Sequence, residues 1–341
     1  MLPFFWRDTR NFGDWCNNVL WPDLIPDLLD PSDGIRLVGV GSLLKSTLRQ
    51  LPGRKIIFGS GSGYGGVPAS RDSPDWEFRF VRGPLTAREF RLDPDLSLVD
   101  GAWLFGLLDG YIPKTNHSGV AFVPHWTSAK FGQWRAVSEM AGLRYVDPTS
   151  DFHEVIKSIA TSELVITESL HGAIFADLFR VPWIPVAIGP DFLPFKWLDW
   201  AYSVDIKELE VIRLPYSSIG EFVRYRSLPT RSPPMIERVV FADQDVRLAV
   251  DLAAPVSAAR YSKAVKIKQT AKRLLNPVAE FLSSSMVPTL ARPWENERYQ
   301  RVAKLLQEVS QVHPYMSLDS VRSSKLEQLD SKIQALRHDY G

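Results

Sequence analysis

The chain has 341 residues and a mass of 38.6 kDa, about twice the length of a typical domain, so we expect two domains with a sizeable core. Hydrophobic residues make up 45% and charged residues 23% of the chain, proportions that exclude a largely disordered or fibrous protein. The 40 Lys and Arg balance 39 Asp and Glu, which excludes an overall field that attracts nucleic acid. The single cysteine, Cys16, excludes an internal disulfide and indicates a reducing cytoplasm.

The first hundred residues alternate short apolar runs with helix-like stretches and glycine-rich turns, which is typical of a parallel α/β sheet. Residues 106–118, which include Gly106, Gly110 and Pro113, are expected to form a linker. We expect strands at residues 2–6, 35–40, 54–59, 77–82 and 97–100, and helices at 14–29, 43–50 and 84–91.

A second alternating block follows the linker, so the sequence predicts two successive α/β halves. After about residue 205 the pattern changes and predicts helices without intervening strands. In the second block we expect strands at 119–124, 143–147, 163–167 and 183–188, and helices at 132–141, 151–160 and 170–179.

A basic stretch in the C-terminal region has two interpretations. Residues 255–285 hold six basic side chains and one acidic one, and within 260–275 the lysines flank an apolar helical face. Such a helix either lies on an anionic membrane surface or, more commonly, packs on the body of the protein through its apolar face. No apolar run reaches the roughly 18 residues of a membrane-spanning helix, so we predict no membrane span.

Ligands of open parallel sheets bind beyond the carboxyl ends of the strands, where turns lead into helix N-termini. Each distinctive residue at these positions also has a structural alternative. The glycines suit tight turns as well as anion binding, Asp14 suits a helix cap, and Arg82 with Asp100 suits a structural ion pair. The residues in question are Asn11, Gly13, Asp14, Gly39, Gly41, Ser42, Gly59, Gly61, Gly63, Arg82, Asp100, His125, Glu168, His171, Gly172 and Lys196.

His171 stands out because it follows the predicted strand at 163–167 and begins a helix. The positive end of that helix is expected to lower the imidazole pKa below about 6.5, so that the ring accepts and returns a proton near neutral pH. A structural histidine that bonds across the cleft is the alternative. No second histidine at helical spacing and no cysteine pair accompany it, so we predict no metal site.

Several of these motifs, in this order, resemble those of the polysaccharide pyruvyltransferase family. The specific ones are Val-Arg-Gly-Pro-Leu-Thr at 81–86 and Ser-Leu-His-Gly-Ala at 169–173. Asn-x-Gly-Asp at 11–14, Asp-Gly-Ala at 100–102 and Val-Pro-His at 123–125 accompany them. The resemblance covers roughly residues 5–200 and leaves the tail outside.

The resemblance implies an α/β fold of two Rossmann-like domains that face each other across a cleft, as in B-type glycosyltransferases. We therefore expect an N-terminal Rossmann-like domain at 1–112, a second one at 113–210 and a mostly helical, partly basic extension at 211–341. The resemblance also implies a reaction without cofactor or metal, in which phosphoenolpyruvate donates its three-carbon unit to two hydroxyls of a sugar or lipid-linked oligosaccharide. The products are phosphate and a pyruvate ketal on an exopolysaccharide or cell-surface glycan, made in the cytoplasm or at the inner face of the membrane.

By the same resemblance His171 is the catalytic histidine that transfers a proton, and Asp14 or Glu168 orients or deprotonates the acceptor. The phosphate and carboxylate of the donor require cations and backbone N–H groups. The candidate substrate-binding residues are Asn11, Gly13, Gly61, Arg82, Arg88, His125 and Lys196.

This chain departs from many family members at Ser169, where they carry an arginine two residues before the histidine. If that arginine binds the donor, Arg82, Lys130 or Lys196 must replace it here, while Ser169 itself suits a helix cap. Two other functions stay open: a nucleotide-sugar glycosyltransferase, which shares the architecture, and a noncatalytic glycan-binding assembly protein. Eleven tryptophans are available either to pack the core or to stack on sugars.

Overall fold

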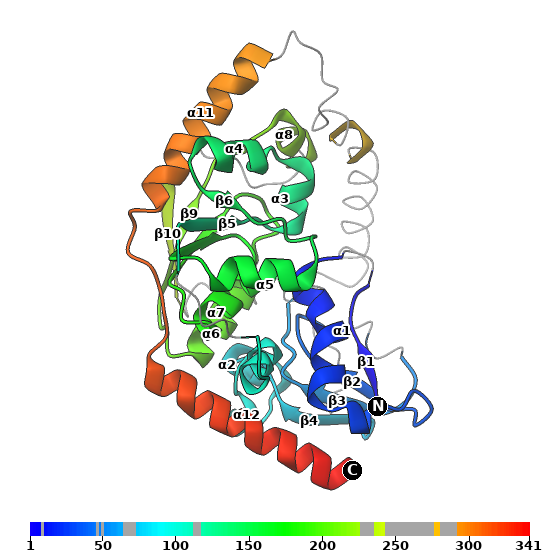
Figure 1. The fold of residues 1–341 in the computed structure, drawn as a ribbon. Helices are drawn as coiled ribbons and strands as arrows, with labels where there is room; N and C mark the ends of the chain where they lie inside the picture. The colour runs from blue at the N-terminus through cyan, green and yellow to red at the C-terminus, as the bar shows by residue number, and fades with distance from the viewer. Residues whose placement is uncertain are drawn as a thin grey trace.

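The computed structural model describes residues 1–7, 10–45, 48, 51–63, 73–111, 117–225, 235–242, 276–279 and 292–341 (Figure 1). They form two sheets with helices around them, which confirms the predicted α/β class. The predicted fifth strand at 97–100 is reduced to one bridge, between Val81 and Ser97. The first sheet is parallel, in the order β1-β2-β3-β4, with β1 at Leu2–Phe4, β2 at Arg36–Val38, β3 at Lys55–Phe58 and β4 at Trp76–Phe80.

The second sheet runs in the order β10-β9-β8-β7-β5-β6. All neighbours are parallel except β9 and β10, which are antiparallel. The expectation of helices without strands after about residue 205 is therefore wrong, because β9 and β10 extend this sheet at its edge. The strands are β5 at Val120–Val123, β6 at Arg144–Tyr145, β7 at Leu164–Thr167, β8 at Trp183–Ala187, β9 at Leu209–Arg213 and β10 at Glu237–Phe241.

The helices occupy the predicted positions in both halves, with one exception. Among the described residues of 43–50, Leu43, Leu44 and Lys45 are not helical and Leu48 has 3-10 conformation, and the predicted linker at 106–118 begins inside a 3-10 helix, η4. The helices are α1 at Phe12–Leu24, α2 at Pro84–Phe90, α3 at Trp126–Phe131, α4 at Trp134–Met140, α5 at Phe152–Ala160, α6 at Leu170–Leu178, α7 at Pro194–Ser203, α8 at Ile219–Tyr225, α11 at Arg292–Val309 and α12 at Asp319–Tyr340, with 3-10 turns η1 at Pro26–Leu28, η3 at Pro94–Leu96 and η4 at Gly101–Leu107.

A continuous hydrophobic core joins the elements of the two sheets. The ring of Phe12 in α1 lies 6.1 Å from that of Phe175 in α6, and the ring of Phe105 in η4 lies 5.1 Å from that of Phe152 in α5. All four side chains are buried. Because burying one such side chain stabilises the fold by about 1.5–3 kcal/mol, this contact fixes the first half against the second.

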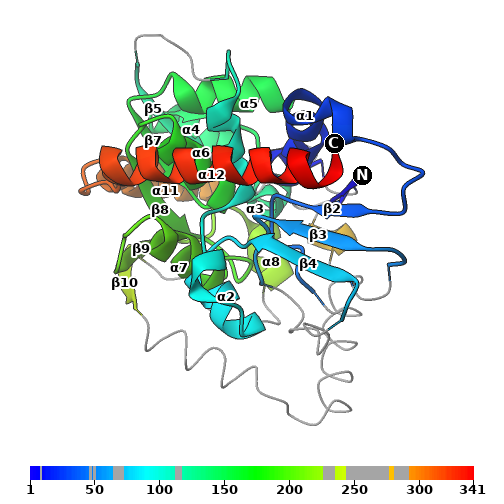
Figure 2. The same ribbon diagram turned by 90° about the horizontal axis from the view of Figure 1, so that it is seen from below.

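The C-terminal helix α12 spans both halves of the molecule. It begins beside α6, where the Arg322 side chain donates to the carbonyl of Leu178 at 2.8 Å. It ends on the first sheet, where the Tyr340 hydroxyl donates to Glu77 at 2.6 Å. Figure 2 shows α12 crossing the lower side of the molecule, with the C-terminus close to the N-terminus. The last part of the predicted C-terminal extension, helix α12, is thus packed against both halves of the fold.

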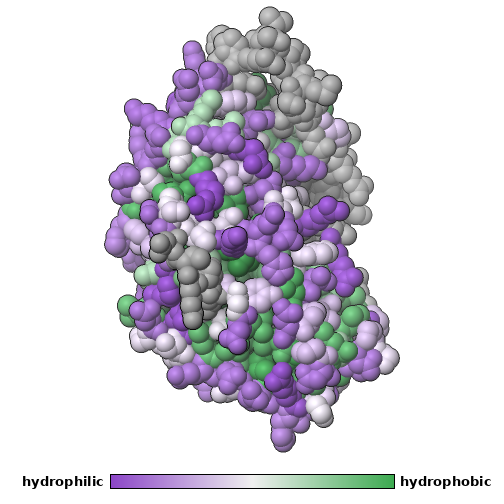
Figure 3. Space-filling view, viewed as in Figure 1, coloured by the Kyte–Doolittle hydropathy of each residue, from purple (hydrophilic) through white to green (hydrophobic). Residues whose placement is uncertain are grey.

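The face shown in Figure 3 carries mostly hydrophilic side chains, with apolar ones in patches between them. Among the helices described above, none combines the length and the apolar character needed to cross a bilayer. The basic stretch at 260–275 lies outside the described residues, so its contact with an anionic membrane stays a prediction.

Candidate active site

A cavity of about 320 Å³ lies where the N-terminal ends of α1, α3, α6 and α7 come together. Its size is that of a small-molecule site. Helix N-termini present unpaired N–H groups and positive dipole ends, so the cavity suits an anionic ligand. We call it the His171 pocket; its lining residues are Trp6, Asn11, Asp14, Ser42, Lys45, His125, Trp126, Ser169, Leu170, His171 and Lys196.

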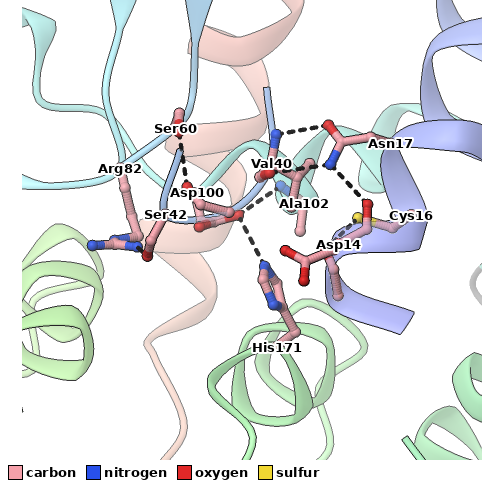
Figure 4. A network of polar contacts seen from close by, with 12 residues as sticks. Asp14, Cys16, Asn17, Val40, Ser42, Ser60, Arg82, Asp100, Ala102 and His171 are labelled. Atoms are coloured by element: carbon pink, nitrogen blue, oxygen red, sulfur yellow. Dashed lines mark hydrogen bonds and ion pairs between the residues drawn. The ribbon is translucent and has the colours of Figure 1, made fainter. Parts of the chain in front are cut away.

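His171 lies in the first turn of α6, with 11% of its side chain exposed. Burial, together with the positive charges of Lys196 and Arg82, lowers its pKa to about 3. The predicted direction of the shift is confirmed, although burial is its main cause. The imidazole is therefore neutral at physiological pH and able to accept a proton. Figure 4 shows the ring directed toward Asp100, whose Oδ1 lies 3.9 Å from Nε2.

Gly13, in the first turn of α1, lies directly under the His171 ring. A Cβ built on Gly13 would lie 2.1 Å from Nδ1 and 2.5 Å from Cγ of His171. The glycine is required here for close approach, because any side chain would occupy the position of the ring. The structure thus places Gly13 beneath the predicted catalytic histidine.

Replacing Gly13 with alanine is expected to displace the His171 ring and to lower kcat by about 10²-fold, because a misplacement of about 1 Å has that effect on a positioned catalytic group. Steady-state kinetics measures the loss. In a His171→Ala background the space is open, so Gly13→Ala should then add no further loss. An equal loss in both backgrounds would show that Gly13 acts independently of the ring.

Two lysines bring positive charge to the His171 pocket. Burial lowers the pKa of Lys196, in the first turn of α7, to about 7. The positive charges of Arg82 and Lys45 also lower this pKa, and the negative charges of Asp14 and Asp191 raise it. Burial also lowers the pKa of Lys45, which Asp14 raises. The Lys45 ammonium lies 5.0 Å from the centre of the Trp6 ring. Both groups are desolvated cations that a dianionic ligand would stabilise.

Asp14 and Asn11 line the same pocket from the start of α1. The cap of α1 is Asn11, not Asp14, which lies within the first turn. The Asn11 amide donates to the Asp14 carboxylate at 3.2 Å. Asp14 therefore brings a carboxylate to the pocket lining, and its role in orienting the acceptor stays a prediction.

Arg82 is fully buried and pairs with Asp199, not with Asp100. Its Nε lies 2.9 Å from Asp199 Oδ2, and its other nitrogens donate to the Ser42 hydroxyl at 2.8 Å and to the carbonyl of Ser62 at 2.5 Å. A Cβ at Gly61 would lie 2.2 Å from Cζ of Arg82, so Gly61 makes room for the guanidinium. Arg82 and Gly61 thus lie behind the pocket wall, and Arg82 acts on His171 through its charge.

Glu168 and His125 connect the strand ends that form the pocket floor. Glu168 is buried, and its carboxylate accepts from the backbone N–H groups of His125 at 3.0 Å, Ile188 at 3.0 Å and Gly189 at 3.2 Å. Burial raises its pKa, and these hydrogen bonds oppose the rise. Of the two residues only His125 lines the pocket. The geometry of Glu168 suits holding the ends of β5 and β8 together.

Arg88 and Lys130 do not line the His171 pocket. Arg88 lies with Arg91 and Lys207 on a separate groove beside α2. Lys130 is exposed in the last turn of α3, with its ammonium 5.4 Å from the centre of the Phe131 ring. Among the three proposed replacements for the family arginine, only Lys196 reaches the pocket lining.

Ser169 is the N-cap of α6 by backbone position, but its side chain makes no capping hydrogen bond. Its N–H instead bonds to the Thr167 hydroxyl at 3.0 Å, and that hydroxyl donates to the Ser169 carbonyl at 2.9 Å. The expectation of a side-chain cap is wrong, because Thr167 already fixes this turn. Ser169 lines the pocket instead.

The pocket lining also includes three residues that the sequence patterns did not indicate, Trp6, Lys45 and Trp126. Lys45 follows the glycine turn at 39–42, and Trp126 follows His125, so both stand next to motifs that were identified. Aromatic rings beside cations suit a sugar next to an anionic donor. Other tryptophans have the packing role: Trp21, Trp103, Trp134, Trp183, Trp197 and Trp200 are fully buried.

Fold and pocket together define an α/β protein with a neutral buried histidine and two lysines around a site for a small anionic ligand. A family model described as "Polysaccharide pyruvyl transferase" matches residues 8–190. The chain is also 33% identical, over an alignment of 356 positions that covers the full length of both proteins, to the succinoglycan biosynthesis protein ExoV of Rhizobium meliloti (strain 1021). No solved structure matches.

The chain belongs to the polysaccharide pyruvyl transferase family, which confirms the predicted family and enzyme class. This membership favours pyruvyl transfer over the glycosyltransferase and the noncatalytic glycan-binding alternatives. Among the residues that the structure describes, no group of three His, Cys, Asp or Glu side chains is arranged as metal ligands.

Proposed function

We propose that the enzyme uses phosphoenolpyruvate as its donor and forms a ketal with two hydroxyls of one sugar in an exopolysaccharide or its lipid-linked precursor. The observation that carries this proposal is the convergence of Lys45, Lys196 and neutral His171 on one pocket at helix N-termini. A phosphate and a carboxylate on one small molecule match two cations and surrounding N–H groups. The name of ExoV, a succinoglycan biosynthesis protein, supports a polysaccharide as the product class.

The residues of the pocket can supply every proton that the reaction needs. In the first step a sugar hydroxyl bonds to C2 of the donor, its proton moves to His171, and the methylene carbon takes a proton from the Lys196 ammonium. In the second step another hydroxyl attacks C2 and gives its proton to the Lys196 amine. The C2–oxygen bond to phosphate breaks, and phosphate leaves with the proton held by His171. Both side chains return to their starting states.

The pKa directions fit these roles. Lys196, with a pKa of about 7, is able to donate and to regain a proton near neutrality. His171, whose pKa of about 3 leaves it neutral, begins as a base. Asp14 is placed to orient the acceptor, and Trp6 and Trp126 offer rings to the sugar.

We also propose that the two halves are Rossmann-like domains at 1–112 and 113–210 that place the active site between them, with 211–341 as an extension. The support is that the pocket is lined by residues of both halves, Lys45 from one and Lys196 from the other among them. A cytoplasmic location, at the inner face of the membrane, rests on the single cysteine and on the basic stretch at 260–275.

The test of the donor is incubation of the enzyme with phosphoenolpyruvate and lipid-linked oligosaccharide of the parent polysaccharide. We expect inorganic phosphate to be released in equal amount to a pyruvyl mass gain on the glycan, measured by mass spectrometry. Phosphate release at the native rate by the Lys196→Met protein, or a glycan without mass gain in the presence of the native enzyme, would overturn the assignment.

Donor use should fall as the pH rises through about 7, because Lys196 loses its positive charge above its pKa of about 7. In the Lys196→Met variant kcat/KM for phosphoenolpyruvate should be about 10- to 100-fold lower at pH 6. The fall in kcat/KM through about pH 7 should be absent in this variant. Initial rates between pH 5.5 and 8.5, a range of about three units around that pKa, measure both effects. The control is Lys130→Met, which replaces an exposed lysine outside the pocket and should keep the native dependence of rate on pH.

A further inference from the structure

Asp100 is a buried carboxylate beside the His171 pocket with an oxygen that has no hydrogen-bond partner. It is the N-cap of η4, where Oδ1 accepts from the Ala102 N–H at 3.0 Å, while Oδ2 is unpaired. The side chain is fully buried. Because an unpaired buried polar atom costs about 1–3 kcal/mol, its presence at a site calls for a functional explanation.

Nε2 of His171 is likewise buried without a hydrogen-bond partner. It lies 3.9 Å from Asp100 Oδ1, and Figure 4 shows the two side chains pointing toward each other from η4 and α6. The carboxylate is held in place because the Gly101 N–H donates to the Gly59 carbonyl at 3.1 Å. Packing of η4 against α6 fixes the facing helix.

The opposite ring nitrogen of His171, Nδ1, lies over Gly13, where a Cβ would be only 2.1 Å away. A side chain at position 13 would cover this nitrogen, which is on the ring edge opposite the buried Nε2. If Nε2 carries the ring proton and points at Asp100, Nδ1 keeps its lone pair for a substrate hydroxyl.

We propose that Asp100 is a positioning residue: it accepts a hydrogen bond from the Nε2–H group of His171 and so fixes the tautomer in which Nδ1 takes the proton of the acceptor hydroxyl. This inference rests on the proposed function and adds the partner that orients its base. As the hydroxyl oxygen bonds to C2 and its proton moves to Nδ1, the imidazolium that forms faces the Asp100 carboxylate. The charge pair stabilises the positive ring at that moment.

The charges around the pair agree with this role. Burial raises the pKa of Asp100 to about 6, Arg82 lowers it and Asp199 raises it, so the group is a carboxylate at neutral pH. Lys196 and Arg82 disfavour the imidazolium of His171. Asp100 Oδ1 lies 3.9 Å from Nε2, close enough for its negative charge to stabilise a positive ring.

The first test is the Asp100→Asn variant. Its carbonyl keeps the cap to Ala102, and its NH2 group takes the place of the unpaired Oδ2, so the ring loses the carboxylate that faces Nε2 and with it the preference for the Nε2–H form. We expect kcat to fall by about 10²–10⁴-fold with KM for phosphoenolpyruvate within about twofold of native. Asp93→Asn is the matched control, because Asp93 caps η3 by the same contact, to the Asp95 N–H, and is exposed. It should leave kcat unchanged.

The second test reads the tautomer directly and needs no turnover. In the ¹⁵N-histidine-labelled full chain, two-bond ¹H–¹⁵N correlations should show the Nε2–H form of His171 in the native protein and a larger share of the Nδ1–H form in Asp100→Asn. His171→Ala should assign the signal. An Nδ1–H form in the native protein would overturn the proposal, even if Asp100→Asn fails to fold. An Asp100→Asn variant with native kcat would also overturn it. So would a further loss of kcat when Asp100→Asn is added to His171→Ala. Absence of any turnover by the native enzyme would reject the proposed function, while the NMR result would still decide the role of Asp100.

Discussion

Replacing His171 with alanine should lower turnover by about 10²–10⁴-fold, the usual contribution of a positioned acid or base. The reason is that the ring is neutral, with a pKa of about 3, and lies on Gly13 within the pocket. Phosphate release with phosphoenolpyruvate and the glycan acceptor measures the loss.

The same variant should keep nearly the native melting temperature, because His171 lines the pocket, so its truncation enlarges an existing cavity instead of opening a new one in the core. His153→Ala, which removes an exposed imidazole from α5, is the control and should alter neither rate nor melting temperature. A His171→Ala protein that melts many degrees lower and has lost its activity to the same extent would favour the structural alternative.

Replacing Arg82 with methionine should lower the free energy of unfolding by about 3–5 kcal/mol, because it leaves the buried carboxylate of Asp199 without its charge partner. Asp199 also accepts from the Thr86 N–H at 2.9 Å and from the Thr86 hydroxyl at 2.6 Å, so it cannot leave its site. Urea unfolding followed by tryptophan fluorescence measures the change.

The double variant Arg82→Met with Asp199→Asn removes both charges and should recover a large part of that loss. Lys207→Met, which breaks an exposed pair with Asp205, should change the free energy of unfolding by less than about 1 kcal/mol. If Arg82→Met instead unfolds like the native enzyme and only raises KM for the donor, the guanidinium binds substrate, as the sequence analysis expected.

Local patterns were enough to predict most of the secondary structure. Strands such as β7 and β8 are short apolar runs bounded by turns, and α5 has an apolar stripe behind the cap formed by Asp151. The failures have physical causes. The antiparallel strand β10 alternates exposed and half-buried residues at a sheet edge, and the strand predicted at 97–100 pairs only through Ser97.

The candidate site also combines features that local sequence predicts with features that only the fold brings together. His171 is evident from its position after a strand and from the motif around it, but the partner of Arg82 is not, because Asp199 lies 117 residues further along the chain. Lys45 and Trp6 join the pocket only after the first half packs on the second. A local sequence pattern does not indicate which residues far apart in the chain lie close together in space.

The order of residues along the chain determined the α/β class, the family and the identity of the central histidine, because each depends on short-range periodicity or on a contiguous motif. The tertiary structure decided which charges stand together. It buried Arg82 against Asp199, turned Asp100 toward His171 and brought Lys45 and Lys196 to one pocket. The physical reason is that burial and Coulomb interactions depend on distances in space, and these are fixed only when the two halves share one core.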